Sequence, residues 1–181
     1  MLSGRSARSP LSPVGQAQAQ WLAARFARDI PIAGIHCSPR ERARETAEII
    51  GARVGVRAQV VEALDEVDFG AWTGRSFEEL EHDPEWRAWN RQRSAVRPPN
   101  GETMADATAR AVGHLDGLLR RGATGTVLCI SHCDIIRGVI AHHLGLGLDR
   151  LLAFDVDPGS VSTVLVGNWG ARLLKLNGGQ E

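Results

Sequence analysis

The sequence predicts an α/β fold, a three-layer α/β/α sandwich around a mainly parallel sheet. Segments with the helical spacing of apolar residues alternate with short apolar runs along the chain, an order typical of parallel strands joined by helices. One of these runs, Thr126–Ile130, leads through Ser131 to a single titratable residue, His132, and a helical pattern starts directly after it. Ligands bind at this end of the strands in open α/β sheets. His132 is therefore either a proton-transferring or anion-binding residue, or a buried histidine of the core.

The length and composition predict one domain, residues 1–181, without a strong overall charge. The chain has 21 basic and 21 acidic residues, so no overall field favours nucleic acid or a membrane surface as a partner. No apolar run approaches the ~20 residues of a membrane span. Cys37, Cys129 and Cys133 are odd in number, which favours reduced thiols and a cytoplasmic location; they lack the pattern of a zinc site. Nothing in the sequence specifies an oligomeric state.

The first part of the chain predicts two helices and two strands. Ser12 followed by Pro13 is typical of a helix start. Ser38, Pro39 and Glu41 likewise predict a helix that Ser38 caps. The predicted elements are a helix from Pro13 to about Arg28, a strand over Ile32–Cys37, a helix from Ser38 through Ile50 and a strand over Arg57–Val61.

Residues 75–101 are predicted to form a lid-like insertion, after which the elements of the sheet resume. Ser76 and Asp83 predict the caps of two short helices, and Trp86 and Trp89 are interpreted as packing residues. The elements predicted after the insertion are a helix capped by Thr103, a buried strand over Thr126–Ile130, a helix ended by Gly145, and a hairpin of Ser160–Val166 with Ala171–Leu176 that completes the sheet. A doubly wound domain usually opens with a buried strand, whereas this chain opens with a loop and a helix, so its first strand is predicted to be missing.

Two further residues are candidates for anion binding or proton transfer. Arg42 falls in the first turn of a predicted helix, where unpaired backbone N–H groups and a guanidinium favour an anion; the alternative is a solvated surface arginine. Glu66 lies between Asp65 and Asp68 in an irregular segment after a strand, where a carboxylate can act as an acid or base. The alternative for this segment is a solvated acidic turn.

Several motifs together resemble, in their order, the histidine phosphatase superfamily, the phosphoglycerate mutase-like group. The resemblance covers roughly residues 4–177, and although each motif is weak by itself, five in order are a strong signal. The motifs are Pro10–Gln18, Ser38–Ala47, Leu64–Gly74, Pro99–Thr103 and Ser131–Arg137.

The resemblance implies phosphoryl transfer from a small phosphorylated substrate through a phosphohistidine, with no metal or other cofactor. Such chemistry needs a histidine nucleophile, cationic donors around the phosphate oxygens and a proton donor for the leaving alkoxide. By resemblance, Arg42 binds the phosphate, Glu66 is the general acid/base and His132 is the second histidine of the pocket, which hydrogen-bonds the phosphoryl oxygens. The backbone of Cys133 adds an N–H donor, and its side chain narrows the pocket where many relatives have glycine.

The departure from the family pattern is the nucleophile. The family begins with a strand that ends in Arg-His-Gly, and this sequence contains no Arg-His-Gly. Leu2–Ser6 resembles the loop after that strand, so ~15–20 residues of strand and loop are expected to be absent. Either the true start lies upstream and the complete protein is a metal-independent phosphomonoesterase, or the chain is a non-catalytic relative that binds a phosphorylated ligand or a protein partner. A phosphoglycerate mutase-type phosphotransferase is a further alternative.

Overall fold

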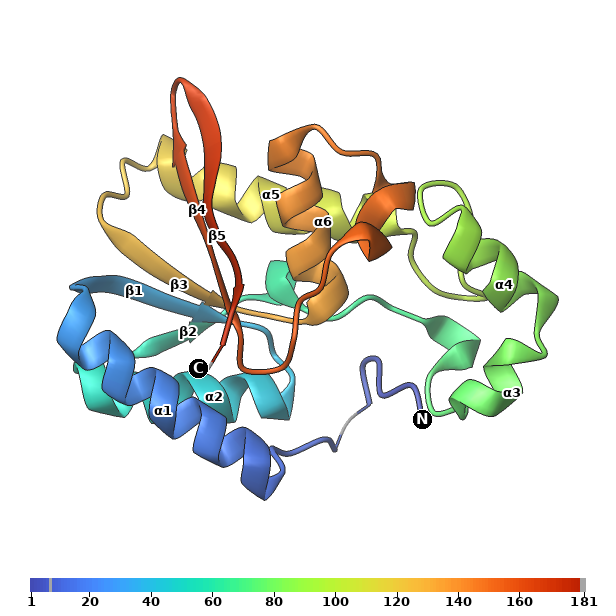
Figure 1. The fold of residues 1–181 in the computed structure, drawn as a ribbon, viewed down its shortest axis with the longest axis horizontal. Coiled ribbons are helices and arrows are strands. Elements are labelled where there is room, and N and C mark those ends of the chain that lie inside the picture. Colours follow the sequence, from blue (N-terminus) through green and yellow to red (C-terminus); the bar gives the residue numbers. More distant parts are fainter. Residues whose placement is uncertain (7, 180–181) are drawn as a thin grey trace.

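The fold is an α/β arrangement in which a short parallel sheet lies between two layers of helices (Figure 1). The computed structural model describes residues 1–6 and 8–179. The helices and strands are α1 (Pro13–Asp29), β1 (Ile32–Cys37), α2 (Glu41–Val54), β2 (Ala58–Val60), α3 (Phe77–Glu81), α4 (Pro84–Arg91), α5 (Met104–Arg120), β3 (Thr126–Ile130), α6 (Cys133–Leu144), β4 (Val161–Gly167) and β5 (Gly170–Gly178).

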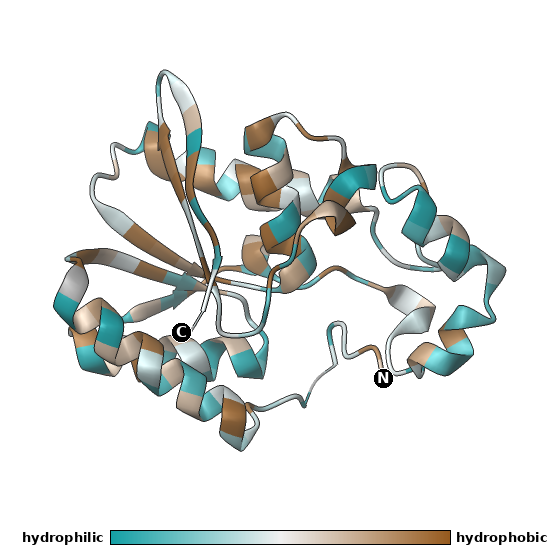
Figure 2. Cartoon of the chain, viewed as in Figure 1, coloured by the Kyte–Doolittle hydropathy of each residue, from teal (hydrophilic) through white to brown (hydrophobic). Residues whose placement is uncertain are grey.

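The parallel sheet has the strand order β2-β1-β3, which confirms the predicted fold class. β1 is central, and Ile35 faces Ala58 of β2 and Leu128 of β3 in the two registers. Helices α1 and α2 cover one face, where Phe26 and Ile50 pack with Ile35 in one apolar cluster. Helices α5 and α6 lie on the other face (Figure 1). The apolar residues of β1 and β3 stand out between the more polar outer surfaces of the helices (Figure 2).

The prediction that β3 is a buried strand is wrong in this structure. All five of its residues are only partly buried, although four of them are apolar. The reason lies in the pairing: β3 bonds β1 along one edge, and no strand in the described part of the chain bonds its other edge.

The C-terminal hairpin forms as predicted but does not complete the sheet. β4 and β5 pair antiparallel with each other as a separate two-stranded sheet. Val161 of β4 nevertheless packs against the same apolar cluster as Leu128 and Ile130 of β3. The hairpin therefore lies close to β3 without being hydrogen-bonded to it.

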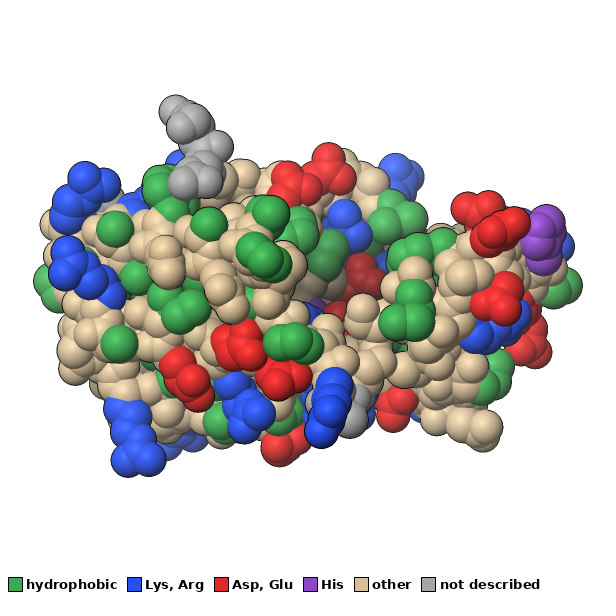
Figure 3. Space-filling model, turned by 90° about the horizontal axis from the view of Figure 1, so that it is seen from below, with side chains coloured by type: hydrophobic (Ala, Val, Ile, Leu, Met, Phe, Trp, Pro, Cys, Tyr) green, Lys and Arg blue, Asp and Glu red, His purple; other side chains and the backbone are tan. Residues whose placement is uncertain are grey.

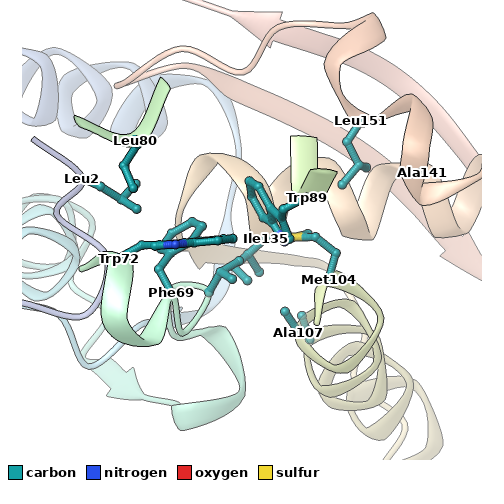
Figure 4. Packing of buried hydrophobic residues seen from close by; sticks show 12 residues of the cluster. Leu2, Phe69, Trp72, Leu80, Trp89, Met104, Ala107, Ile135, Ala141 and Leu151 are labelled. Atoms are coloured by element: carbon teal, nitrogen blue, oxygen red, sulfur yellow. The ribbon is translucent and has the colours of Figure 1, made fainter. Parts of the chain in front are cut away.

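Residues 75–101, the predicted insertion, pack through their tryptophans into a second apolar cluster, whose buried members include Phe69, Trp72 and Met104. Trp89 is completely buried, lies 5.3 Å from the stacked ring of Trp86, and meets Phe69 edge to face at 5.5 Å. Figure 4 shows the Trp89 side chain close to Met104 and Ile135, which belong to α5 and α6. Residues 75–101 are thus anchored to the helix layer next to the sheet.

The helix starts at Ser12, Ser76 and Thr103 follow from local hydrogen bonds. The hydroxyl of each accepts a backbone N–H from the first turn, and Ser76 and Thr103 form complete capping boxes with Glu79 and Asp106. These bonds satisfy donors that a helix end otherwise leaves free. None of the helices in the described residues is both long and apolar enough to cross a membrane.

Trp89→Ala should lower the free energy of unfolding by about 3–5 kcal/mol, because truncating a buried tryptophan leaves a large cavity. Trp169→Ala is the matched control, since Trp169 is 64% exposed at the hairpin turn and its loss should change stability by less than about 0.5 kcal/mol. Urea denaturation of the two variants measures both values. Equal destabilisation would contradict the anchoring of the insertion by Trp89.

Candidate functional site

The candidate site lies at the carboxyl ends of β1 and β3. Because these strands are adjacent and parallel, the residues that follow them meet: the Ser38 N–H donates to the Ile130 carbonyl at 2.9 Å, and His132 lies two residues further along. The structure thus places His132 where ligands bind in parallel α/β sheets. One face of the molecule is hollowed near its middle, and basic, acidic and histidine side chains are visible in the hollow (Figure 3).

His132 is a buried, neutral histidine whose tautomer follows from its partners. Its Nδ1 lies 2.9 Å from Nη2 of Arg42, and a guanidinium can only donate, so Nδ1 is the acceptor. The proton of the neutral ring is therefore on Nε2, which donates to Ser38 Oγ at 2.7 Å. Burial, followed by the positive charges of Arg42, Arg40, Arg110 and Arg5, lowers the pKa of His132 to about 3. The field that opposes protonation of His132 favours an anion beside it.

Ser38 has a different role from the predicted one. The N-cap of α2 is Arg40, which makes no side-chain cap, and Ser38 is completely buried. Its hydroxyl accepts from His132 and lies 3.3 Å from Oδ1 of Asp65. Ser38 Oγ still accepts the Arg40 N–H at 3.2 Å, but α2 starts at Glu41, so this bond precedes the helix and the other partners of Ser38 are distant in the chain.

Arg42 lies in the first turn of α2, as predicted, and points into the site. Its Nη2 donates to the Gly4 carbonyl at 3.2 Å and lies 3.6 Å from Oε2 of Glu66. Its Nη1 is buried and has no hydrogen-bond partner among the described residues. Burial lowers the pKa of Arg42, the carboxylate of Glu66 opposing this. A buried donor without an acceptor is costly, and an anion at this position would supply the acceptor.

Glu66 contributes a buried carboxyl group to the site. Its Oε2 lies 3.6 Å from Nδ1 of His132, and its Oε1 accepts the Val67 N–H at 2.9 Å. Burial raises the pKa of Glu66 to about 7, and the nearby carboxylate of Asp134 adds to the rise, while the Val67 bond and Arg42 act against it. A carboxyl group with this pKa can give and take a proton near neutral pH.

Cys133 is the first residue of α6, directly after His132, and its side chain is exposed. Partial burial of the thiol nevertheless raises the pKa of Cys133. The side chain of His132, which is the N-cap of α6, makes no capping hydrogen bond. The first N–H groups of this twelve-residue helix are consequently left for another acceptor.

The structure brings Arg42, Glu66, His132 and Cys133 together, but sequence reasoning missed the residues that support them. Arg5, Arg40, Arg110, Asp65 and Glu102 form a network of ion pairs and hydrogen bonds around the segment that carries Glu66. Glu102 belongs to the motif Pro99–Thr103, which was the available signal, although the motif alone assigned it no contact.

The other histidines occupy different places. His36 of β1 and His114 of α5 bond each other at 2.8 Å. His82 is the C-cap of α3 in the insertion, and His142 and His143 lie in the last turn of α6, at the opposite end from His132. Within residues 1–6 and 8–179, no group of three or more His, Cys, Asp or Glu side chains could hold a metal ion.

The comparison with protein families finds that residues 2–178 match the histidine phosphatase superfamily (branch 1). Phosphoserine phosphatase 1 of Hydrogenobacter thermophilus is 30% identical over 169 residues, which cover 92% of this chain and 80% of that protein. The adenosylcobalamin/alpha-ribazole phosphatase of Salmonella typhimurium is 29% identical over 173 residues, or 94% of this chain and 85% of that protein. The bifunctional protein Rv2228c of Mycobacterium tuberculosis is 33% identical over 153 residues; these cover 84% of this chain, which spans only 42% of that relative.

Solved structures share the fold. The structure of Bacillus stearothermophilus YhfR matches with a TM-score of 0.90 and 24% identity, covering 98% of this chain and 89% of that chain. The alpha-ribazole phosphatase of Shigella flexneri matches with a TM-score of 0.82 and 26% identity, covering 99% of this chain and 91% of that one.

Glu66 and His132 should affect stability in opposite ways as the pH changes. The folded pKa of Glu66, about 7, lies above its usual 4.5, so its contribution to stability is complete at low pH and is lost as the pH rises toward 7. The folded pKa of His132, about 3, lies below its usual 6.5, so its contribution is complete above pH 6.5 and is lost as the pH falls. Between pH 7 and pH 5 the two contributions nearly cancel.

Replacing either residue should therefore reveal the pH dependence of stability that the other one causes. From pH 7 to pH 5, Glu66→Gln should lose about 2 kcal/mol of unfolding free energy relative to the unmodified protein, and His132→Gln should gain about 2 kcal/mol. Urea denaturation at both pH values checks the prediction. Parallel pH dependences in the two variants would show that these groups do not titrate as the site geometry requires.

Proposed function

Because the chain belongs to the histidine phosphatase superfamily (branch 1), we propose that its site is that of a metal-independent phosphomonoesterase working through a phosphohistidine. The observation that carries the proposal is the convergence of Arg42, His132 and Glu66 at the open N-terminus of α6, where the buried Nη1 of Arg42 has no partner among the described residues. A phosphoryl group placed there would receive donors from the guanidinium and the helix N–H groups, and from Nδ1 of the imidazole once that nitrogen is protonated.

In this proposal each residue has a separate role. Arg42 binds the non-bridging oxygens. The pKa of His132 rises when the anion binds, since a nearby negative charge favours the protonated imidazole. Glu66, whose pKa of about 7 leaves it partly protonated at neutral pH, donates a proton to the leaving alkoxide. Its carboxylate then takes a proton from the attacking water.

The reaction has two steps. A nucleophilic histidine nitrogen forms a bond to phosphorus as the bond to the leaving oxygen breaks, and the leaving oxygen takes the proton of Glu66. Water then attacks phosphorus, its proton passes to Glu66, and the N–P bond breaks to release inorganic phosphate. His132 assists both steps by hydrogen-bonding the oxygens on which charge develops.

The nucleophile of this proposal belongs to a segment that residues 1–181 lack. Three observations on the described residues support an additional strand between β3 and β4. No strand bonds the outer edge of β3, its apolar residues are partly exposed, and the neighbouring hairpin is not hydrogen-bonded to it. A parallel strand at that edge would end beside His132, since parallel strands share their carboxyl ends, and an Arg-His-Gly sequence there would supply the attacking nitrogen. Residues 75–101 act as the lid in this proposal and select the substrate.

The substrate class is a small phosphomonoester. Two of the relatives are named as phosphatases, with names that refer to phosphoserine and to alpha-ribazole or adenosylcobalamin, which supports hydrolysis over a mutase-type transfer. The second candidate function is binding without catalysis. It is favoured by the placement of the other histidines of the described residues away from Arg42, which leaves the pocket with donors for an anion but no second histidine.

Residues 1–181 should hydrolyse p-nitrophenyl phosphate negligibly, while a protein extended upstream by an encoded apolar strand and Arg-His-Gly should hydrolyse it in the presence of EDTA. The DNA directly upstream of the Met1 codon shows whether that extension exists. A stop codon there, together with phosphate binding that Arg42→Ala abolishes in calorimetry, would favour the non-catalytic alternative. Robust turnover by residues 1–181 that His132→Ala removes would show that His132 is itself the nucleophile.

In the active, extended protein, Glu66→Gln should reduce kcat by about 10²–10⁴-fold for an alkyl phosphate, because leaving-group protonation is lost. The reduction should be smaller for p-nitrophenyl phosphate, whose leaving group needs little protonation. Steady-state rates with both substrates measure the difference, with Glu62→Gln as the control because Glu62 is exposed in the same segment. An unchanged rate and pH profile would exclude Glu66 as the acid.

A further inference from the structure

The segment that carries Glu66 has no regular structure of its own. Residues 65–69 lie between two short 3-10 turns, Glu62–Leu64 and Gly70–Trp72, and belong to neither a helix nor a strand. No ladder of backbone hydrogen bonds therefore holds Glu66 at its 3.6 Å separations from Arg42 and His132. Something else must hold it there.

Arg110 of α5 supplies much of that support. Its Nη1 donates to the carbonyls of Ala63 and Asp65 at 2.9 and 2.8 Å. Its Nη2 donates to the carbonyl of Glu66 at 3.0 Å. One planar guanidinium thus bonds three carbonyl oxygens within four consecutive residues, an arrangement that the rigid fork of arginine allows and a lysine ammonium cannot reproduce with the same geometry.

Glu102 fixes the guanidinium in turn. Its two carboxylate oxygens accept from Nε and Nη2 of Arg110 at 3.2 and 2.7 Å, a two-point contact of the strong, charge-assisted kind. The same carboxylate accepts the Asp68 N–H at 2.9 Å and Nη2 of Arg5 at 2.7 Å. Arg5 also donates to the Glu66 carbonyl at 2.8 Å.

Both supports rest on well-packed backbone. Helix α5 is anchored by Ala107 and Ala111, which are completely buried on either side of Arg110 along the chain. Glu102 is held by close backbone crossing, where its N–H donates to the Asp68 carbonyl at 2.9 Å and a Cβ on Gly101 would overlap that same oxygen. The support for the segment is therefore rigid in the sense that catalytic preorganisation needs.

We propose that Arg110, braced by Glu102, is a positioning residue that holds the carboxyl group of Glu66 in the buried site. This inference rests on the proposed function for its role in catalysis. The groups that face Glu66 are Arg42 from α2, His132 and Asp134 from the start of α6, and Asp65 from its own segment. Arg110 bonds none of their side chains. Its charge helps to lower the pKa of His132, and Arg110→Lys keeps that charge.

The sign of a pKa change distinguishes positioning from a simple charge effect. Removing a nearby cation alone raises the pKa of a carboxyl group. Release of the segment lets Glu66 reach solvent, and because burial is the largest cause of its raised pKa, that pKa must then fall. Arg110→Met removes the charge and the fork together, and Arg110→Lys keeps the charge and removes the fork.

The test is an NMR titration of residues 1–181 labelled with ¹³C at the glutamate carboxyl groups, with Glu66→Gln to assign the signal. We expect a Glu66 midpoint near the value of about 7 in the unmodified protein, and a midpoint lower by at least about one unit in both Arg110 variants. Arg97→Met is the matched control: Arg97 also bonds one carbonyl and one carboxylate, but lies 55% exposed outside the network. The midpoint of Glu66 should not change in Arg97→Met.

A midpoint that is unchanged or raised in folded Arg110→Lys overturns the proposal, with near-ultraviolet circular dichroism as the check of folding. If Arg110→Met does not fold, the lysine variant alone decides the outcome. The titration needs no turnover, so an upstream-extended protein that proved inactive would reject the proposed function and leave this result standing. In an active protein, the loss of kcat at high pH should move to lower pH in Arg110→Lys with little change in KM.

Discussion

The parallel pairing of β1 with β3 is the constraint on which the site depends. Because both strands end at the same edge, Ser38 and His132 come within hydrogen-bonding distance although they are 94 residues apart in the chain. Helices α2 and α6 start just beyond these residues, so that Arg42 and the free N–H groups of α6 point into one place. The residue types matter only because the topology makes their positions coincide.

The electrostatics of the site follow from burial beside a group of arginines. A buried imidazole surrounded by guanidinium groups stays neutral, and a buried carboxyl group keeps its proton to near neutral pH. Below about pH 7 the carboxyl group of Glu66 is therefore mostly protonated, while Nδ1 of His132 accepts a hydrogen bond from Arg42. A phosphate dianion that binds there would compete with His132 for the guanidinium of Arg42. Its negative charge would also favour protonation of His132 and Glu66, so phosphate binding and the protonation of the site are coupled.

The edge of β3 that no described strand bonds is next to the site, because β3 leads directly to His132. Apolar side chains that a central strand normally buries are partly exposed, and the hairpin packs nearby without bonding to β3. An unpaired edge of this kind carries free backbone donors and acceptors. The site residues are nevertheless assembled, because Arg42, Glu66 and His132 are held by α2, by the Arg110–Glu102 network and by α6, none of which depends on a strand at that edge.

The sequence by itself determined the features that depend on near neighbours. Capping at Ser12, Ser76 and Thr103, the apolar runs of β1 and β3 and the turn of the β4–β5 hairpin all follow from residues a few positions apart. The ordered motifs also identified Arg42, Glu66 and His132 as candidates. Only the tertiary structure decided where the hairpin lies, how far β3 is buried, why Ser38 serves His132 instead of capping α2, and how Arg110 and Glu102 support Glu66. Each of these depends on partners distant in the chain, whose approach is set by packing and strand pairing and leaves no local periodicity to read.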